Sequence, residues 1–87
     1  KASSGAEHNM LTHFDIVPNP TTHAIAIKGI DSNRVQSLTI YNMYGIAVSK
    51  FGYGIIECSV RNLPAGVYIA VVNLGNGTFA KQRFVKI

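Results

Sequence analysis

The stretch that decides the fold is Leu-Pro-Ala-Gly-Val-Tyr-Ile-Ala-Val-Val-Asn at residues 63–73. Pro64 presets φ at the first corner of a turn, and we expect Gly66 to take a positive φ after it. Residues 67–72 are an unbroken apolar run rich in β-branched side chains, which is typical of a strand buried on both faces. The stretch therefore predicts a tight turn that feeds a central strand, which leaves through a hairpin loop at residues 73–77.

Working outward from this stretch, the rest of the chain consists of short apolar segments separated by turn residues. No segment shows a helical period with a cap, and the turn signals recur about every 8–12 residues. This pattern predicts an all-β fold, an immunoglobulin-like antiparallel β-sandwich of about seven strands. Besides residues 67–72, the expected strands cover residues 14–17, 24–30, 35–41, 46–50, 56–61 and 78–87.

Side-chain alternation predicts which residues of these strands face the core. In the strand at 46–50 we expect Ile46 and Val48 to point inward. The last strand is ambiguous, because Phe79 and Val85 share one parity while Phe84 has the other. The ambiguity indicates either cover on both faces or a β-bulge.

Charge is unevenly distributed along this chain of 87 residues, whose formal net charge is +4. No acid follows Glu57, so Arg61, Lys81, Arg83 and Lys86 carry the whole excess. A basic terminal strand can attract nucleic acid, an anionic glycolipid or an acidic protein surface. Nucleic acid binding would need basic residues interleaved with aromatics across one face, and four bases in one terminal region fall short of that. The same charges can instead blunt an edge strand against aggregation, and both interpretations stay open.

The chain length and the absence of certain segments limit the domain organisation. One hydrophobic core suffices for a chain of this size, so we expect a single domain. No apolar run approaches the ~18 residues of a membrane helix, and we expect a soluble protein. The first residue is Lys and no signal segment follows, so we expect a fragment or a processed piece of a longer chain. Residues 1–12 are small, polar and unpatterned, which is typical of a flexible linker.

Four motifs follow one another in an order that is typical of a known family. They are Phe14-x-Ile16-x-Pro18-Asn19-Pro20-Thr21, Ile40-Tyr41-Asn42-x-x-Gly45-x-x-Val48, Leu63-Pro64-Ala65-Gly66-Val67-Tyr68 and Lys81-x-x-x-Val85-Lys86. In this order and at these spacings the chain resembles the C-terminal sorting domain of the type IX secretion system, type A class, of the Por secretion family. The family often has Gly after the proline turn, where this chain has His23. The structural motif residues are Pro18, Asn19, Pro20, Gly45, Leu63, Pro64, Gly66 and Tyr68.

The resemblance implies a non-catalytic sorting domain at residues 13–87. Domains of this family carry an N-terminally fused cargo through an outer-membrane translocon, after transit of the periplasm of a Gram-negative bacterium. A sortase-like cysteine peptidase then cuts before the domain, which here means within residues 1–12. The resemblance thus implies two partners, the translocon and the peptidase, with a secreted or cell-surface destination for the cargo.

We hypothesise that the terminal strand is the part that the translocon recognises. A terminal strand offers unpaired backbone groups, so the machinery could add a strand to its edge. The residues of this hypothesis are Lys81, Arg83, Phe84, Val85 and Lys86.

The sequence indicates no enzyme, metal site or cofactor. The spacing of His8, His13 and His23 matches no recognised ligand pattern. Cys58 is the single cysteine and lies in an apolar strand, so we expect a buried, unreactive thiol. No combination of nucleophile, base and acid stands in a catalytic setting.

A second function class stays open beside the sorting signal. An accessory adhesion or carbohydrate-binding β-sandwich of an extracellular protein would use exposed aromatics to stack on sugars. Tyr41, Tyr44 and Tyr53 are the residues that favour this alternative.

Overall fold

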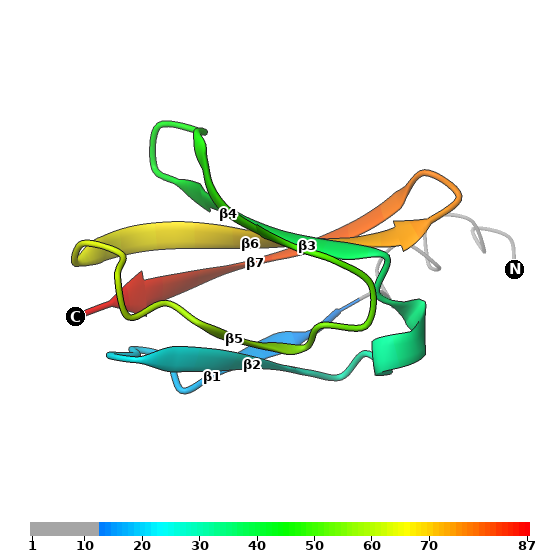
Figure 1. The fold of residues 1–87 in the computed structure, drawn as a ribbon, viewed down its shortest axis with the longest axis horizontal. Helices are drawn as coiled ribbons and strands as arrows, with labels where there is room; N and C mark the ends of the chain where they lie inside the picture. Colours follow the sequence, from blue (N-terminus) through cyan, green and yellow to red (C-terminus); the bar gives the residue numbers. More distant parts are fainter. Residues whose placement is uncertain (1–12) are drawn as a thin grey trace, which may run out of the picture.

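The computed structural model describes residues 13–87, which form two antiparallel β-sheets packed face to face (Figure 1). One sheet has the strand order β1-β2-β5 and the other the order β4-β3-β6-β7. This division of strands is that of an immunoglobulin-like sandwich, so the predicted fold class is confirmed. The elements are β1 (Asp15–Val17), β2 (Ala24–Lys28), the 3-10 helix η1 (Ser32–Arg34), β3 (Ser37–Asn42), β4 (Ala47–Phe51), β5 (Glu57–Ser59), β6 (Gly66–Gly75) and β7 (Thr78–Lys86).

Strand β6 lies between β3 and β7 and supplies the middle of the core. Its inward side chains are Tyr68, Ala70 and Val72, all buried. Ile69, on the opposite face, is 36% exposed. The expectation of a strand buried on both faces is therefore wrong, since the outer face of this sheet has no covering layer among residues 13–87. The buried core consists of Phe14, Ile16, Ile25, Ile27, Ile30, Val35, Leu38, Ile40, Cys58, Val60, Tyr68, Ala70, Val72, Ala80 and Phe84.

The turn before β6 is held by side-chain hydrogen bonds. The Tyr68 hydroxyl donates to the carbonyl of Pro64 at 2.6 Å, and the Lys86 ammonium donates to the carbonyl of Leu63 at 3.0 Å. A tyrosine that bonds back to the chain a few residues upstream is the tyrosine corner of immunoglobulin-like domains. Gly66 is the first residue of β6 and has no positive φ, so the expectation of a left-handed glycine there is wrong.

The hairpin between β3 and β4 contains the predicted left-handed glycine, since Gly45 has a φ of 78°. The predicted inward orientation of Ile46 and Val48 is wrong, because these side chains are 59% and 37% exposed. The pairing of β3 with β4 shifts register between Ile40 and Tyr41. This irregularity changes the phase of β4, so that Phe51, and not Val48, packs against the core.

In β7 the residues of even number point inward. Ala80 and Phe84 are buried, whereas Phe79 is exposed and Val85 is half-buried. Neither expected explanation of the mixed parity holds, because the register irregularity lies in β6, between Asn73 and Gly75. The outer face of β7 simply carries an exposed aromatic.

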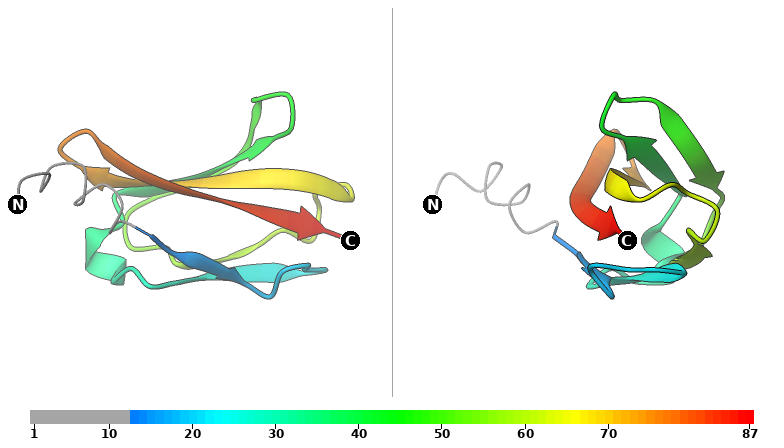
Figure 2. Two further views of the ribbon diagram at one scale, coloured as in Figure 1. Left: turned by 180° about the vertical axis from the view of Figure 1, so that it is seen from behind. Right: turned by 90° about the vertical axis from the view of Figure 1, so that its left-hand side faces the viewer.

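The end of β7 runs close to the turn between β1 and β2, as Figure 2 shows. Thr21 forms a parallel bridge with Lys86. The Thr21 amide donates to the Val85 carbonyl at 2.9 Å, and the Ile87 amide donates to the Thr21 carbonyl at 2.9 Å. The bridge ties the two sheets together along this side. Helices long and apolar enough to cross a membrane are absent from the described residues.

Candidate recognition surface

The terminal strand presents its predicted recognition residues on two different faces. Lys81 and Arg83 are exposed and Val85 is half-buried, all on the outer side of the four-stranded sheet. Phe84 is 0% exposed and stacks on Tyr68 with ring centroids 5.7 Å apart. The structure thus brings three of the five residues together on one surface and assigns Phe84 to the core.

Lys86 is the other inward residue of the group and is 8% exposed. Its ammonium is used in the hydrogen bond to the Leu63 carbonyl, which fixes the turn before β6. Burial of a charged group is costly unless it is hydrogen-bonded, and this bond supplies the compensation. In the folded domain Lys86 therefore stabilises the turn before β6 and is not accessible to a partner.

The outer face of the four-stranded sheet combines apolar and basic side chains. Along β6 the outward residues include Ile69 and Val71, which pair with Arg83 and Lys81 of β7. On the other side of β6, Thr39 of β3 pairs with Val71 and also with Lys50 of β4. We call this surface the basic sheet face; its residues are Thr39, Tyr41, Lys50, Val67, Ile69, Val71, Phe79, Lys81, Arg83 and Val85.

No acid lies on the four strands of this sheet. The acids of residues 13–87 are Asp15 on β1, Asp31 before η1 and Glu57 on β5, so all of them belong to or border the three-stranded sheet. The charge excess seen in the sequence is therefore also a spatial asymmetry. Such a surface attracts anionic or acidic partners by a field that salt screens over about 10 Å.

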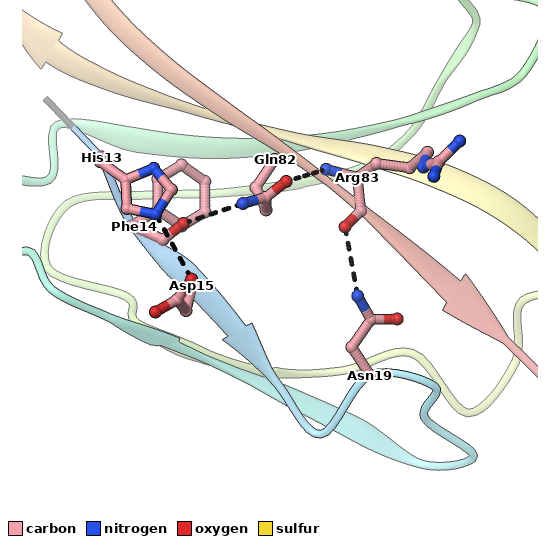
Figure 3. Close-up of polar contacts among 6 residues, drawn as sticks. All are labelled: His13, Phe14, Asp15, Asn19, Gln82 and Arg83. Atoms are coloured by element: carbon pink, nitrogen blue, oxygen red, sulfur yellow. Dashed lines mark hydrogen bonds and ion pairs between the residues drawn. The ribbon is translucent and has the colours of Figure 1, made fainter. Parts of the chain in front are cut away.

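The edge of β7 is closed along its C-terminal half. The side chain of Asn19 accepts a hydrogen bond from the Val85 amide at 3.0 Å and donates to the Arg83 carbonyl at 3.4 Å. The Gln82 side chain accepts from the Arg83 amide at 3.1 Å and donates to the Phe14 carbonyl at 3.2 Å (Figure 3). With Thr21 bonded to Val85 and Ile87, the backbone groups that face this edge have partners.

This closure corrects the expectation of an unpaired terminal edge. A strand from a partner cannot pair with the segment from Arg83 to Ile87 unless Asn19 and Thr21 first leave it. Asn19 lies in the proline turn, whose peptide bonds before Pro18 and Pro20 are both cis. This turn places the side-chain amide of Asn19 within hydrogen-bond distance of the β7 backbone.

Sequence reasoning missed Gln82, whose side chain bonds to the backbone of both Arg83 in β7 and Phe14 just before β1. Its partner Phe14 lies 68 positions away in the chain. A single glutamine between basic residues gives no signal of such a distant contact. Only the topology, which places β1 beside β7, reveals it.

The candidate chemical groups do not converge on a reactive site. The His13 imidazole lies 3.4 Å from the Asp15 carboxylate, and His23 shares a hydrogen bond with Thr22. His8 lies outside the described residues, as does the expected linker and processing region at residues 1–12. Within residues 13–87 no group of three His, Cys, Asp or Glu side chains could hold a metal ion, and no pocket is present.

Cys58 is buried in β5, as the sequence predicts. Burial disfavours the thiolate and raises the pKa of Cys58 to about 11. The thiol is therefore protonated at neutral pH and is a poor nucleophile.

The tyrosines of the carbohydrate alternative do not form one platform. Tyr44 lies in the turn before β4 and Tyr53 in the turn after it, so the length of β4 separates them. Tyr41 is half-buried near the end of β3, opposite Ala47 and beside the first of these turns. Stacking on a sugar chain needs aromatic rings that share a surface, and this arrangement gives that alternative no support.

Comparison with known proteins gives one match. The family model described as secretion system C-terminal sorting domain matches residues 15–86, which is nearly the whole of the described sandwich. Neither the curated proteins nor the solved structures contain a significant match.

Proposed function

Because this chain belongs to the secretion system C-terminal sorting domains, which are signals of type IX secretion, we propose that it takes its cargo through the outer-membrane translocon. The family match over residues 15–86 is the observation that carries this function. A domain of this family works with the type IX machinery on a cargo fused N-terminally to it. The cargo of such a signal is secreted or displayed at the cell surface.

The finer steps of the proposal concern the route and the processing of the cargo. The fusion crosses the periplasm, and a sortase-like cysteine peptidase cuts within residues 1–12. The domain itself has no catalytic role in these steps. In support, residues 1–12 precede the family match.

The machinery recognises the basic sheet face in this proposal. Lys81, Arg83 and Val85 are the predicted recognition residues that the fold leaves accessible there. The absence of acids on the four strands leaves this face complementary to an acidic protein surface. Phe84 and Lys86 contribute by holding the sheet and the turn in shape.

Protection against aggregation is the competing explanation of the same charges. β4 and β7 are the edges of the sheet, and Lys50, Lys81 and Arg83 lie on these edge strands. A charge of either sign blunts an edge, whereas recognition by an acidic surface requires positive charge. Charge reversal therefore separates the two explanations, since the variant keeps a charged edge.

The experiment compares the variant K81E/R83E with K28E/R34E in a fusion to a reporter. Both variants exchange two exposed bases and give the same net charge, but Lys28 and Arg34 lie on β2 and η1. We expect the β7 variant to lower export several-fold and the control to leave it unchanged, with both chains folded by circular dichroism. If both variants are exported equally well, the positive charges of β7 are not needed for recognition, and protection against aggregation remains as their explanation.

A further inference from the structure

The tip of the β3–β4 hairpin is the most apolar exposed segment of the domain. Met43 is 69% exposed, Tyr44 is 81% exposed and Ile46 is more than half exposed. These three side chains fall within four consecutive residues, and Figure 1 shows the hairpin rising away from the sheet. A soluble domain gains nothing in stability from large apolar groups in water, and such groups in one place mark interaction sites.

The tip is held in one shape by Asn42. The Asn42 side-chain oxygen accepts hydrogen bonds from the amides of Tyr44 at 2.9 Å and Ile46 at 3.1 Å. The backbone amide of Asn42 donates to the Ile46 carbonyl at 2.9 Å, and the backbone carbonyl of Asn42 accepts from the Gly45 amide at 3.0 Å. The turn thus satisfies these polar backbone groups before any partner binds, which lowers the cost of moving the tip out of water.

From these observations we propose that the hairpin tip inserts into an apolar cleft of a protein of the secretion machinery, with Met43, Tyr44 and Ile46 as its anchors. The proposal rests on the function proposed above and adds a second contact to the basic sheet face. The core does not use the apolar residues beside the register shift between Ile40 and Tyr41, since Ile46 and Val48 are both exposed.

The chemistry of the tip favours a protein cleft over a lipid surface. No charged residue lies between Asn42 and Ser49, so the hairpin offers nothing to lipid head groups until Lys50. Membrane-surface segments instead combine an apolar face with several bases. Tyr and Met are enriched in the cores of protein interfaces, where one or two anchors in a pocket supply most of the affinity.

The test uses export of a reporter fused to residues 1–87 in a host with this secretion system. The variant M43Q/Y44Q/I46T makes the tip polar and keeps Asn42 and Gly45. The matched control, V17T/I55T, makes polar two exposed apolar residues away from the tip, one at the end of β1 and one in the turn after β4. In parallel, a photo-crosslinking phenylalanine analogue replaces Tyr44 or, as the control, Tyr53.

We expect the tip variant to lower export about tenfold, since loss of interface anchors costs more than 1 kcal/mol. The control variant should export like the unaltered chain, and both should unfold at its thermal midpoint. The analogue at position 44, but not at position 53, should crosslink to an outer-membrane protein.

Two results would overturn the inference and leave the sorting function intact. One is normal export of the tip variant, without a crosslink from position 44, while the unaltered fusion is exported. The other is binding of the unaltered chain, but not of the tip variant, to vesicles of phosphatidylethanolamine and phosphatidylglycerol, which would assign the tip to lipid. Failure of the unaltered fusion to leave the periplasm would overturn the proposed function itself.

Discussion

Tyr68 and Asn19 are two residues of the family motifs whose structural roles follow from the chemistry of their side chains. Tyr68 combines a ring in the core with a hydroxyl that reaches the Pro64 carbonyl, and only tyrosine offers both at this length. Asn19 both donates and accepts, which a strand edge with alternating carbonyl and amide groups requires. At the scale of the residue, these motif side chains therefore fasten a turn to a strand by hydrogen bonds.

The substitution Tyr68→Phe tests the first of these tasks. It keeps the ring and removes the hydrogen bond to Pro64, so we expect the free energy of unfolding to fall by about 1–2 kcal/mol. Urea denaturation measures this loss. An unchanged midpoint would show that the bond adds nothing to the stability of the turn.

The substitution Asn19→Ala tests the closure of the β7 edge. Because the Val85 amide loses its acceptor, we expect its hydrogen exchange to become at least about tenfold faster, as loss of about 1.4 kcal/mol of local protection implies. Exchange measured by NMR resolves this amide. Asn62→Ala, at an exposed turn, is the control and should leave the exchange of Val85 as it is.

The thiol of Cys58 gives a prediction about pH. Its pKa is about 11 in the folded chain against an ordinary value of 9.0, so folding favours the protonated thiol. The corresponding stability is complete below pH 9 and is lost as the pH rises toward 11. We expect the stability difference between the unaltered chain and Cys58→Ala to shrink over this range in urea denaturation. A difference that is constant from pH 7 to 11 would contradict the burial effect.

At the scale of the element, β6 and β4 show why one-faced strands are hard to assign from sequence. β6 is apolar on both faces, but one of these faces is the accessible basic sheet face. The alternation of Ile46 and Val48 would suit a core, but Ile46 precedes β4 at the exposed hairpin tip, and Val48 falls at the register shift in the pairing with β3. Alternation predicts the period of a strand, and the partner strand decides its phase.

The phase of β4 can be tested by stability. We expect I46T/V48T to change the free energy of unfolding by less than about 0.5 kcal/mol, because both side chains are exposed. Leu38→Ala, in the buried face of β3, should cost about 2–5 kcal/mol. A large loss in the β4 variant would restore the inward orientation that the sequence pattern indicates.

The β3–β4 turn and the fold class were predictable, because proline, glycine and asparagine act through their local conformations, although Gly66 does not take the positive φ expected of it. Gly45 behaves as expected, and the order of turns and strands sufficed for the sandwich. The contacts of Asn19, Gln82 and Lys86 were not predictable, because each joins segments far apart in the chain. These contacts decide which of the predicted recognition residues are accessible and which are buried, so that assignment required the structure.

At the scale of the whole molecule, charge and apolar surface are separated. Of the acids of the described residues, Asp15 and Glu57 lie on the three-stranded sheet and Asp31 lies before η1, while the four-stranded sheet carries an acid-free face and a projecting apolar hairpin. The recognition proposed above rests on these two exposed surfaces, the basic sheet face and the hairpin tip.

The central measurement is the location of a neutral reporter fused to residues 1–87, with a leader that delivers the fusion to the periplasm. It is made in a host with the type IX system and in the same host without its outer-membrane translocon. We predict reporter in the medium or on the cell surface of the first host and retention in the periplasm of the second. Retention in both hosts, or release from both, would contradict the sorting function.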